Sequence, residues 1–261
     1  MANPSTIGVI CVRGPDAVSF LQGQLSQDVS KLPASGVVLS GYHNPQGRVI
    51  AVLRLTRVDD AGIAAMLPQE LASTVAARLS KFVLRAKVKI TDETELWSVG
   101  LDWALQAHTD QLPAGAASMH APNALIRHRV AIAACQPQVY AATSEMFVSQ
   151  MLNLDVLGGI AFDKGCYTGQ EVIARAHYRG RVKRRMQRFI AAEAVALRPG
   201  DECSLPDGRS ARVVDVASGD TGGTQFLAVT TFATPQDDVT DAVRHTTVNA
   251  IAAPMPYALP E

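Results

Sequence analysis

Apolar and polar positions along the first hundred residues follow two different periods. Short runs rich in β-branched residues predict strands, at residues 6–12, both arms of 37–55, 62–67, 86–91 and 96–101. Apolar positions at helical spacing predict two helices, within 13–29 and over 69–84. This order is an α+β pattern, and two ferredoxin-like units forming one larger body would account for it.

The hairpin over 37–55 carries one arginine in an apolar setting. Asn44 to Gly47 has proline at the second position of a turn and glycine at the fourth. On the second arm, Ile50, Val52 and Arg54 share one face. The simpler interpretation is that Arg54 ends the strand and extends its head into water. The alternative is an anion contact. An arginine flanked by aliphatic residues suits a ligand with an aromatic and a carboxylate end, so we predict Arg54 beside a central pocket.

The chain changes character twice further on. Residues 111–122 are rich in Pro, Gly, Ala and Ser, which predicts a loop, and 157–162 is an apolar run that predicts a strand. After Phe189, short strand-like runs are broken by Pro-Gly, Asp-Gly and Gly-Gly, as in a small β-barrel or sandwich. The expected domains are therefore 1–184 and 185–261.

Composition limits the possible classes of protein. A hydrophobic content of 48% fills a core, and 24 basic residues balance 24 acidic ones, so no global field draws the chain to nucleic acid or membrane. No run of about 18 apolar residues occurs, and we expect a cytoplasmic protein without membrane contact. The four cysteines lie far apart, without CxxC spacing, and predict neither a metal site nor disulfides.

One cysteine stands in a distinctive setting, the stretch DKGCYTGQEVIARAHYRGRVKRR at 163–185. Thr168 and Glu171 fit a capping box, which predicts a helix beginning at Thr168. The helix dipole and Lys164 would then favour the thiolate of Cys166. A cysteine merely packed under the loop is the alternative interpretation. No Ser/His/Asp or Cys/His spacing supports covalent hydrolysis.

Basic residues follow the cysteine without an acidic residue between Glu171 and Glu193. They are Arg175, Arg179, Arg181, Lys183, Arg184, Arg185 and Arg188. A solvated face explains any one of them, but so many like charges together predict a polyanion, either nucleic-acid phosphates or a carboxylate-rich cofactor tail.

These residues resemble a known family. The segment 152–185, with its core KGCYTGQE, is similar to the signature of the YgfZ folate-binding proteins, relatives of the glycine-cleavage T-protein. Residues 14–29, the NPQGRVIAVLRL hairpin and SKFVLRAKVKI resemble the family in the expected order. The resemblance covers most of the first 190 residues.

The resemblance implies a fold, a cofactor and a role. It implies two ferredoxin-like modules and a β-barrel in a ring around a hole that takes tetrahydrofolate, and a function in maintaining iron-sulfur enzymes, including those that thiolate tRNA. The site residues it implies are Cys166 and Lys164 for chemistry, and Tyr167, Gln170, Glu171 and Arg175 for folate. Arg54 joins the expected folate contacts because of its place on the hairpin face. The basic run offers a further interpretation, in which it contacts tRNA; since only Tyr167, Tyr178 and Phe189 could stack on bases there, direct RNA recognition ranks below binding of a cofactor tail or a client. The residues of that contact are Arg179, Arg181, Lys183, Arg184 and Arg185.

Two functions remain open at this point. The first is a tetrahydrofolate-binding accessory protein for iron-sulfur client enzymes, which need not turn over substrate. The second is a folate-dependent one-carbon transferase. T-proteins carry an acidic pair soon after the hairpin glycine, whereas here no carboxylate follows Gly47 until Asp59, and this departure disfavours aminomethyl transfer.

Overall fold

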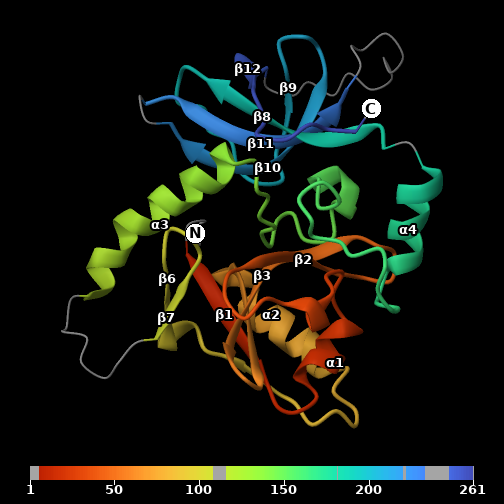
Figure 1. Ribbon diagram of the computed structural model, residues 1–261. Helices are drawn as coiled ribbons and strands as arrows, with labels where there is room; N and C mark the ends of the chain where they lie inside the picture. Colours follow the sequence, from red (N-terminus) through yellow and green to blue (C-terminus); the bar gives the residue numbers. More distant parts are fainter. Residues whose placement is uncertain (1–5, 108–115, 181, 220–221, 233–246, 261) are drawn as a thin grey trace.

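A computed structural model describes residues 6–107, 116–180, 182–219, 222–232 and 247–260, and gives only the backbone of 116–122. It is a mixed α+β structure with two five-stranded antiparallel sheets and few helices, which confirms the predicted class (Figure 1). None of the helices in these ranges is long and apolar enough to span a lipid bilayer.

The N-terminal sheet has the strand order β2-β3-β4-β1-β5. Its strands are β1 Ile7–Arg13, β2 Val38–His43, β3 Val49–Asp59, β4 Gly62–Pro68 and β5 Lys89–Asp92. Two helices and a 3-10 turn accompany it: α1 Ala17–Gln22, α2 Gln69–Ser80 and η1 Val29–Lys31. The predicted strands, hairpin and second helix are confirmed, whereas α1 is shorter than its predicted segment.

Both faces of this sheet are covered, and this explains why β3 and β4 are buried along nearly their whole length. On one face α2 packs on β1 through Leu71, Val75 and Leu79. On the other, a hairpin of β6 Trp97–Val99 and β7 Leu105–Ala107, entered through η2 Thr94–Leu96, covers a small cluster that contains Cys11. Cys11 is thus the small core residue that its apolar strand predicts.

The middle of the chain departs from prediction in two places. Helix α3, Ala116–Ala133, occupies most of the predicted loop 111–122, of which 111–115 lies outside the described residues. Pro122 lies inside this helix and costs it about 3 kcal/mol, so alanine propensity alone does not explain the helix; contacts of α3 with β10 and β11 support it. The run 157–162 is irregular rather than a strand, and it is held by Ser26, whose hydroxyl donates to Gly159 O at 2.7 Å. A 3-10 turn, η3 Ser149–Leu152, and helix α4, Gln170–Arg179, complete this region.

The C-terminal sheet has the order β12-β8-β11-β10-β9. Its strands are β8 Arg184–Ala191, β9 Glu202–Ser204, β10 Ser210–Ser218, β11 Thr224–Thr231 and β12 Ala250–Ala253. Stacked Phe189 and Phe226, 5.3 Å apart, lie in its core. Figure 1 shows this sheet facing the N-terminal one, with α3 and α4 on opposite sides. A closed barrel, ferredoxin-like modules and the domain division at 184/185 stay predictions.

Candidate functional site

The thiol motif lies on a loop that leads into α4. The helix begins at Gln170, and its N-cap is Gly169, with φ 82° and no side-chain capping bond. The predicted capping box of Thr168 and Glu171 is therefore wrong. The Glu171 carboxylate instead pairs with Arg175, 3.0 Å away, and both side chains lie exposed on α4.

A contact between two backbones explains this helix start. The hairpin turn at 44–47 forms as predicted, with Gly47 N donating to Asn44 O at 2.9 Å. A Cβ on Gly169 would lie 2.6 Å from Asn44 O and 3.0 Å from Gly47 Cα. Only glycine tolerates both that approach and a positive φ. The turn thus determines where the chain can enter α4.

Lys164 ties the motif loop to the N-terminal half of the molecule. Its Nζ donates to the carbonyls of Gln22, Leu25 and Gln27 at 2.7, 2.7 and 2.8 Å. An ammonium group has three protons, so none is left to bond the thiol of Cys166. Burial lowers the pKa of Lys164 to about 8. The structure supports an anchoring role for Lys164, whereas its predicted chemical role stays a prediction.

The side chain that follows the cysteine points inward. Tyr167 is buried, its ring lies 5.0 Å from Lys164 Nζ and 6.2 Å from the ring of His43, and burial raises its pKa to about 12. Gln170 Oε1 accepts from Tyr167 N at 3.3 Å. Tyr167 and Gln170 therefore hold the loop in place, beside a buried His43 whose Nε2 lies 2.5 Å from Ser149 Oγ.

Cys166 is the exposed member of the four cysteines, and the other three are buried. Burial raises the pKa of Cys11 to about 12, and those of Cys135 and Cys203 to about 11. The neighbour of Cys166, Gly165, has no atom within 4 Å of the position of a Cβ, so the loop beside the thiol borders open space. Cys166 is therefore the one of the four thiols that another molecule can reach from solvent.

Arg54 lies in the interior, so the expectation that its head reaches water is wrong. Its side chain is 1% exposed, because residue 54 is in the middle of β3 and pairs with Leu39 and Met66 on its two sides. The guanidinium lies 3.6 Å from the ring centroid of Trp103, a cation-π contact. Nη2 donates to Gln136 Oε1 at 3.5 Å, and Nη1 has no partner among the described residues. Burial lowers the pKa of Arg54 to about 9, and it stays a cation at neutral pH.

A buried polar network next to Arg54 was not expected from the sequence. Asp215 Oδ1 accepts from the Tyr140 hydroxyl at 2.9 Å and lies 2.8 Å from His128 Nε2, while Oδ2 has no partner among the described residues. Burial, and then Asp215, raise the pKa of Tyr140 well above its usual value. The one available signal was a lone carboxylate in the apolar run RVVDVA, at a bulge of β10.

The structure does not bring all predicted folate contacts together. No hydrogen bond, ion pair or ring contact joins Arg54 to Tyr167, Gln170, Glu171 or Arg175 in the described part of the chain. Arg54 belongs to the sheet face under the β6–β7 hairpin, and the other four belong to the motif loop and α4.

The basic run divides into exposed and buried members. Arg179, Lys183 and Arg184 are exposed, and Arg181 lies outside the described residues. Arg185 is wrong as a surface contact: it is 4% exposed, and its two Nη atoms donate to the Asp155 carboxylate at 2.9 and 2.8 Å. Arg184 and Arg185 lie on opposite faces of β8, and the face of Arg185 meets Asp155, which compensates its charge.

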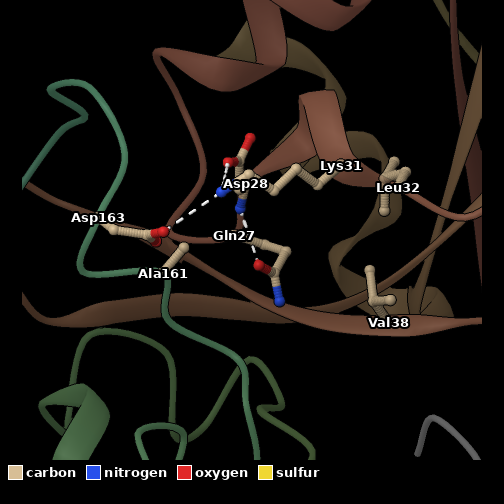
Figure 2. Close-up of a pocket in the computed structure, with 7 residues that line it drawn as sticks. All are labelled: Gln27, Asp28, Lys31, Leu32, Val38, Ala161 and Asp163. Atoms are coloured by element: carbon tan, nitrogen blue, oxygen red, sulfur yellow. Dashed lines mark hydrogen bonds and ion pairs between the residues drawn. The ribbon is translucent and has the colours of Figure 1, made fainter.

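Two cavities lie near the motif. The smaller, about 180 Å³, is lined by Gln27, Asp28, Lys31, Leu32, Val38, Ala161 and Asp163 (Figure 2). Lys31 lies between Asp28 and Asp163, at 3.1 and 3.2 Å, which leaves little room for a cofactor. The larger, about 550 Å³, is lined by Gln150, Asp155, Ala176, His177, Gly180, Val182, Arg185 and Pro260. Only the larger has the size of a small-molecule site. In the described ranges no group of three His, Cys, Asp or Glu side chains could hold a metal ion.

Comparison with solved structures identifies the class of fold. The crystal structure of the glycine cleavage system aminomethyltransferase T from Bartonella henselae aligns with a TM-score of 0.65, covering 87% of this chain and 77% of that chain at 15% identity. The chain therefore has a T-protein-like fold.

Curated relatives then identify the family. No family model matches the chain. The tRNA-modifying protein YgfZ of Pectobacterium atrosepticum is 30% identical, over 76% of this chain and 72% of that protein. The YgfZ of Edwardsiella ictaluri is also 30% identical, over 95% of this chain and 89% of that protein. The chain belongs to the YgfZ family, as its thiol motif predicts.

Proposed function

We propose that this chain is a cytoplasmic, tetrahydrofolate-binding accessory protein that supports assembly or repair of iron-sulfur cluster enzymes, including tRNA-modifying ones. The observation that carries the proposal is the exposed Cys166 on a loop fixed at both sides, by Lys164 and by Gly169. A thiol held in a defined place and open to solvent suits contact with a client protein. The naming of the relatives as tRNA-modifying proteins supports the same role.

The proposed architecture is a ring of two ferredoxin-like modules, within 1–184, and a β-barrel at 185–261. The T-protein-like fold and the two facing sheets support it. Tetrahydrofolate would lie in the centre of the ring and, when bound, supply a reduced pterin that can carry one-carbon groups.

Arg54 is the residue that we assign to the folate carboxylate. A buried guanidinium that lacks a partner for Nη1 is costly, and an anionic oxygen would complete its hydrogen bonds. The ring of Trp103 already covers one face of the guanidinium and holds it in place. Tyr167 and Gln170 would act by positioning the loop, and Glu171 with Arg175 would meet the ligand or a client from the exposed side of α4.

Calorimetry with tetrahydrofolate tests the cofactor proposal. We expect Arg54→Met, which keeps the stem and removes the charge, to weaken binding about ten-fold or more, because a hydrogen bond to a charged group is lost. The matched control is Arg57→Met on the same strand, whose Nε donates to Leu32 O and which should bind normally. Equal affinity of the Arg54→Met protein and the wild type would remove Arg54 from the site.

A cellular assay separates the two candidate functions. Cys166→Ser keeps the size of the side chain and removes the thiol, so we expect it to bind folate normally and to lose support of iron-sulfur enzymes in cells that lack the protein. Full complementation by this variant would contradict the thiol role. Folate-dependent formaldehyde or methylene transfer by the wild type would instead establish the one-carbon transferase.

The exposed cations Arg179, Lys183 and Arg184 are the surface that we propose for tRNA contact. Arg185 is excluded from it by its pairing with Asp155. Replacing Lys183 and Arg184 by Gln should weaken RNA binding and flatten its salt dependence, because fewer counterions are released.

A further inference from the structure

The larger cavity lies where η3, α4, the start of β8 and Pro260 near the C-terminus meet. Gln150 comes from η3, Ala176 and His177 come from α4, and Arg185 is the second residue of β8. Its volume of about 550 Å³ is in the range of pockets that hold one small ring system. None of the residues that we assign to folate or to the thiol lines it.

One buried polar atom that lines the cavity lacks a hydrogen-bond partner among the described residues. Arg185 and Asp155 satisfy each other through two hydrogen bonds. Gln150 is 1% exposed, and its Nε2 donates to Ile173 O at 2.8 Å, while its Oε1 has no partner among the described residues. A buried carbonyl oxygen without a donor costs about 1–3 kcal/mol, so a ligand that offers an N–H is favoured here.

Flat side chains stand beside the cavity. His177, which lines it, stacks on Phe162 with ring centroids 3.8 Å apart and planes 18° apart. Tyr178 meets both rings edge-on, at 4.8 and 6.0 Å, and is 68% exposed. Such a cluster offers a stacking surface to a planar heterocycle.

Exposed cations adjoin the lining residues along the chain. Gly180 and Val182 line the cavity, and their chain neighbours Arg179 and Lys183 are exposed, as is Arg184. No acidic residue occurs from 172 to 192. Asp155 in the cavity is neutralised by Arg185, and Glu171 further along α4 by Arg175. Three cations spread along the chain fit a row of phosphates better than one carboxylate.

We infer that this cavity is a nucleotide site that takes one unpaired base of an RNA strand. An amino or imino N–H of the base donates to Gln150 Oε1, the ring lies against His177, and the flanking phosphates lie along Arg179, Lys183 and Arg184. This inference rests on the proposed tRNA contact and adds the base-binding pocket to it. It is independent of folate binding and of Cys166.

Fluorescence anisotropy with a labelled 12-nucleotide single-stranded RNA tests the site. Ala176→Leu narrows the cavity without changing the charge, and we expect it to weaken RNA binding about ten-fold, a loss typical of one stacked base. The matched control, Ala174→Leu, makes the same change on α4 away from the cavity lining and should bind like the wild type. Tyr178→Ala, an exposed position that leaves folding intact, should weaken binding at least three-fold. Adenosine monophosphate should bind much more weakly than the strand.

Four outcomes would overturn the inference. The first is that Ala176→Leu and Ala174→Leu bind the RNA equally well. The second and third are that the wild type binds inorganic polyphosphate of the same charge as tightly as the RNA, or binds adenosine monophosphate as tightly as the strand. The fourth is that tetrahydrofolate displaces the RNA. Should Ala176→Leu fold poorly, unchanged binding by Tyr178→Ala overturns it equally. Calorimetry with tetrahydrofolate reports separately on the proposed cofactor, so the two failures are distinguishable.

Discussion

Replacing Arg185 should destabilise the protein strongly, although this residue belongs to a run of basic residues whose pattern predicts an exposed surface. Its side chain is 5% exposed and that of Asp155 is 8% exposed. Besides the two bonds to Asp155, its Nη1 donates to Gln150 O at 3.0 Å and to Asn153 Oδ1 at 3.4 Å. The guanidinium therefore joins β8 to η3 and to the turn that follows.

The size of the effect follows from what Arg185→Met leaves behind. The methionine fills much of the space of the arginine stem, but the Asp155 carboxylate stays buried without its counter-charge. Breaking a buried pair in this way costs about 3–5 kcal/mol. Since the whole stability of a domain is about 5–15 kcal/mol, such a loss is easily measured.

Urea unfolding followed by circular dichroism measures this loss, with Arg184→Met as the control. Arg184 is the exposed neighbour on the same strand, and its replacement should change the free energy of unfolding by no more than about 0.5 kcal/mol. The double variant Arg185→Met with Asp155→Leu removes both charges and should recover most of the loss. If Arg185→Met unfolded at the same urea concentration as Arg184→Met, the buried pair would not exist in solution.

Three further predictions concern the motif loop and its surroundings. A thiol reagent at neutral pH should label Cys166 first and Cys11 last, because burial raises the pKa of Cys11 to about 12. Gly169→Ala should cost about 2 kcal/mol or more, because alanine resists a φ of 82° and its Cβ would overlap Asn44 O. The free energy of unfolding should decrease as the pH is lowered from about 6.5. Burial lowers the pKa of His43 to about 3, so in this range the unfolded chain binds a proton at His43 and the folded chain does not.

Each of these has a clear contrary result. Peptide mapping that finds Cys135 or Cys203 labelled before Cys166 would contradict the exposure of the motif. A Gly169→Ala protein as stable as wild type would mean that the turn and the loop do not touch. For His43, stability is fully present above about pH 6.5 and is lost toward pH 3 at about 1.4 kcal/mol per unit. An equal slope in a His43→Gln protein would assign that loss to other groups.

Local pattern predicts most of the N-terminal sheet but not what covers it. The strands, the turn at 44–47 and helix α2 follow from periodicity and turn residues, which act over a few positions. The strand pattern does not predict the burial of Arg54, because that burial depends on Trp103, which a hairpin much further along the chain brings over β3. A strand pattern identifies the face of a residue, and only tertiary packing decides whether that face meets water.

The same reason limits prediction of the site. Cys166 stands out in the sequence, and its exposure agrees with that. The start of α4 and the burial of Arg185 depend instead on partners distant in the chain, the turn at 44–47 and Asp155. Asp215 gives a local signal, as a lone carboxylate in an apolar run, but His128 and Tyr140 give none, and the three form a network only where α3 meets β10.

The contact between Gly47 and Gly169 bears on the structural role of the motif KGCYTGQE. The motif suggests that every residue in it serves the thiol. Its second glycine is instead required by close contact with a turn more than a hundred positions away in the chain. The lysine likewise donates its hydrogen bonds to three carbonyls in the segment 22–27. Much of this motif therefore serves to fix the position of the loop that carries the cysteine. A related chain could keep nearly all of these residues for that structural purpose after the cysteine itself had been replaced.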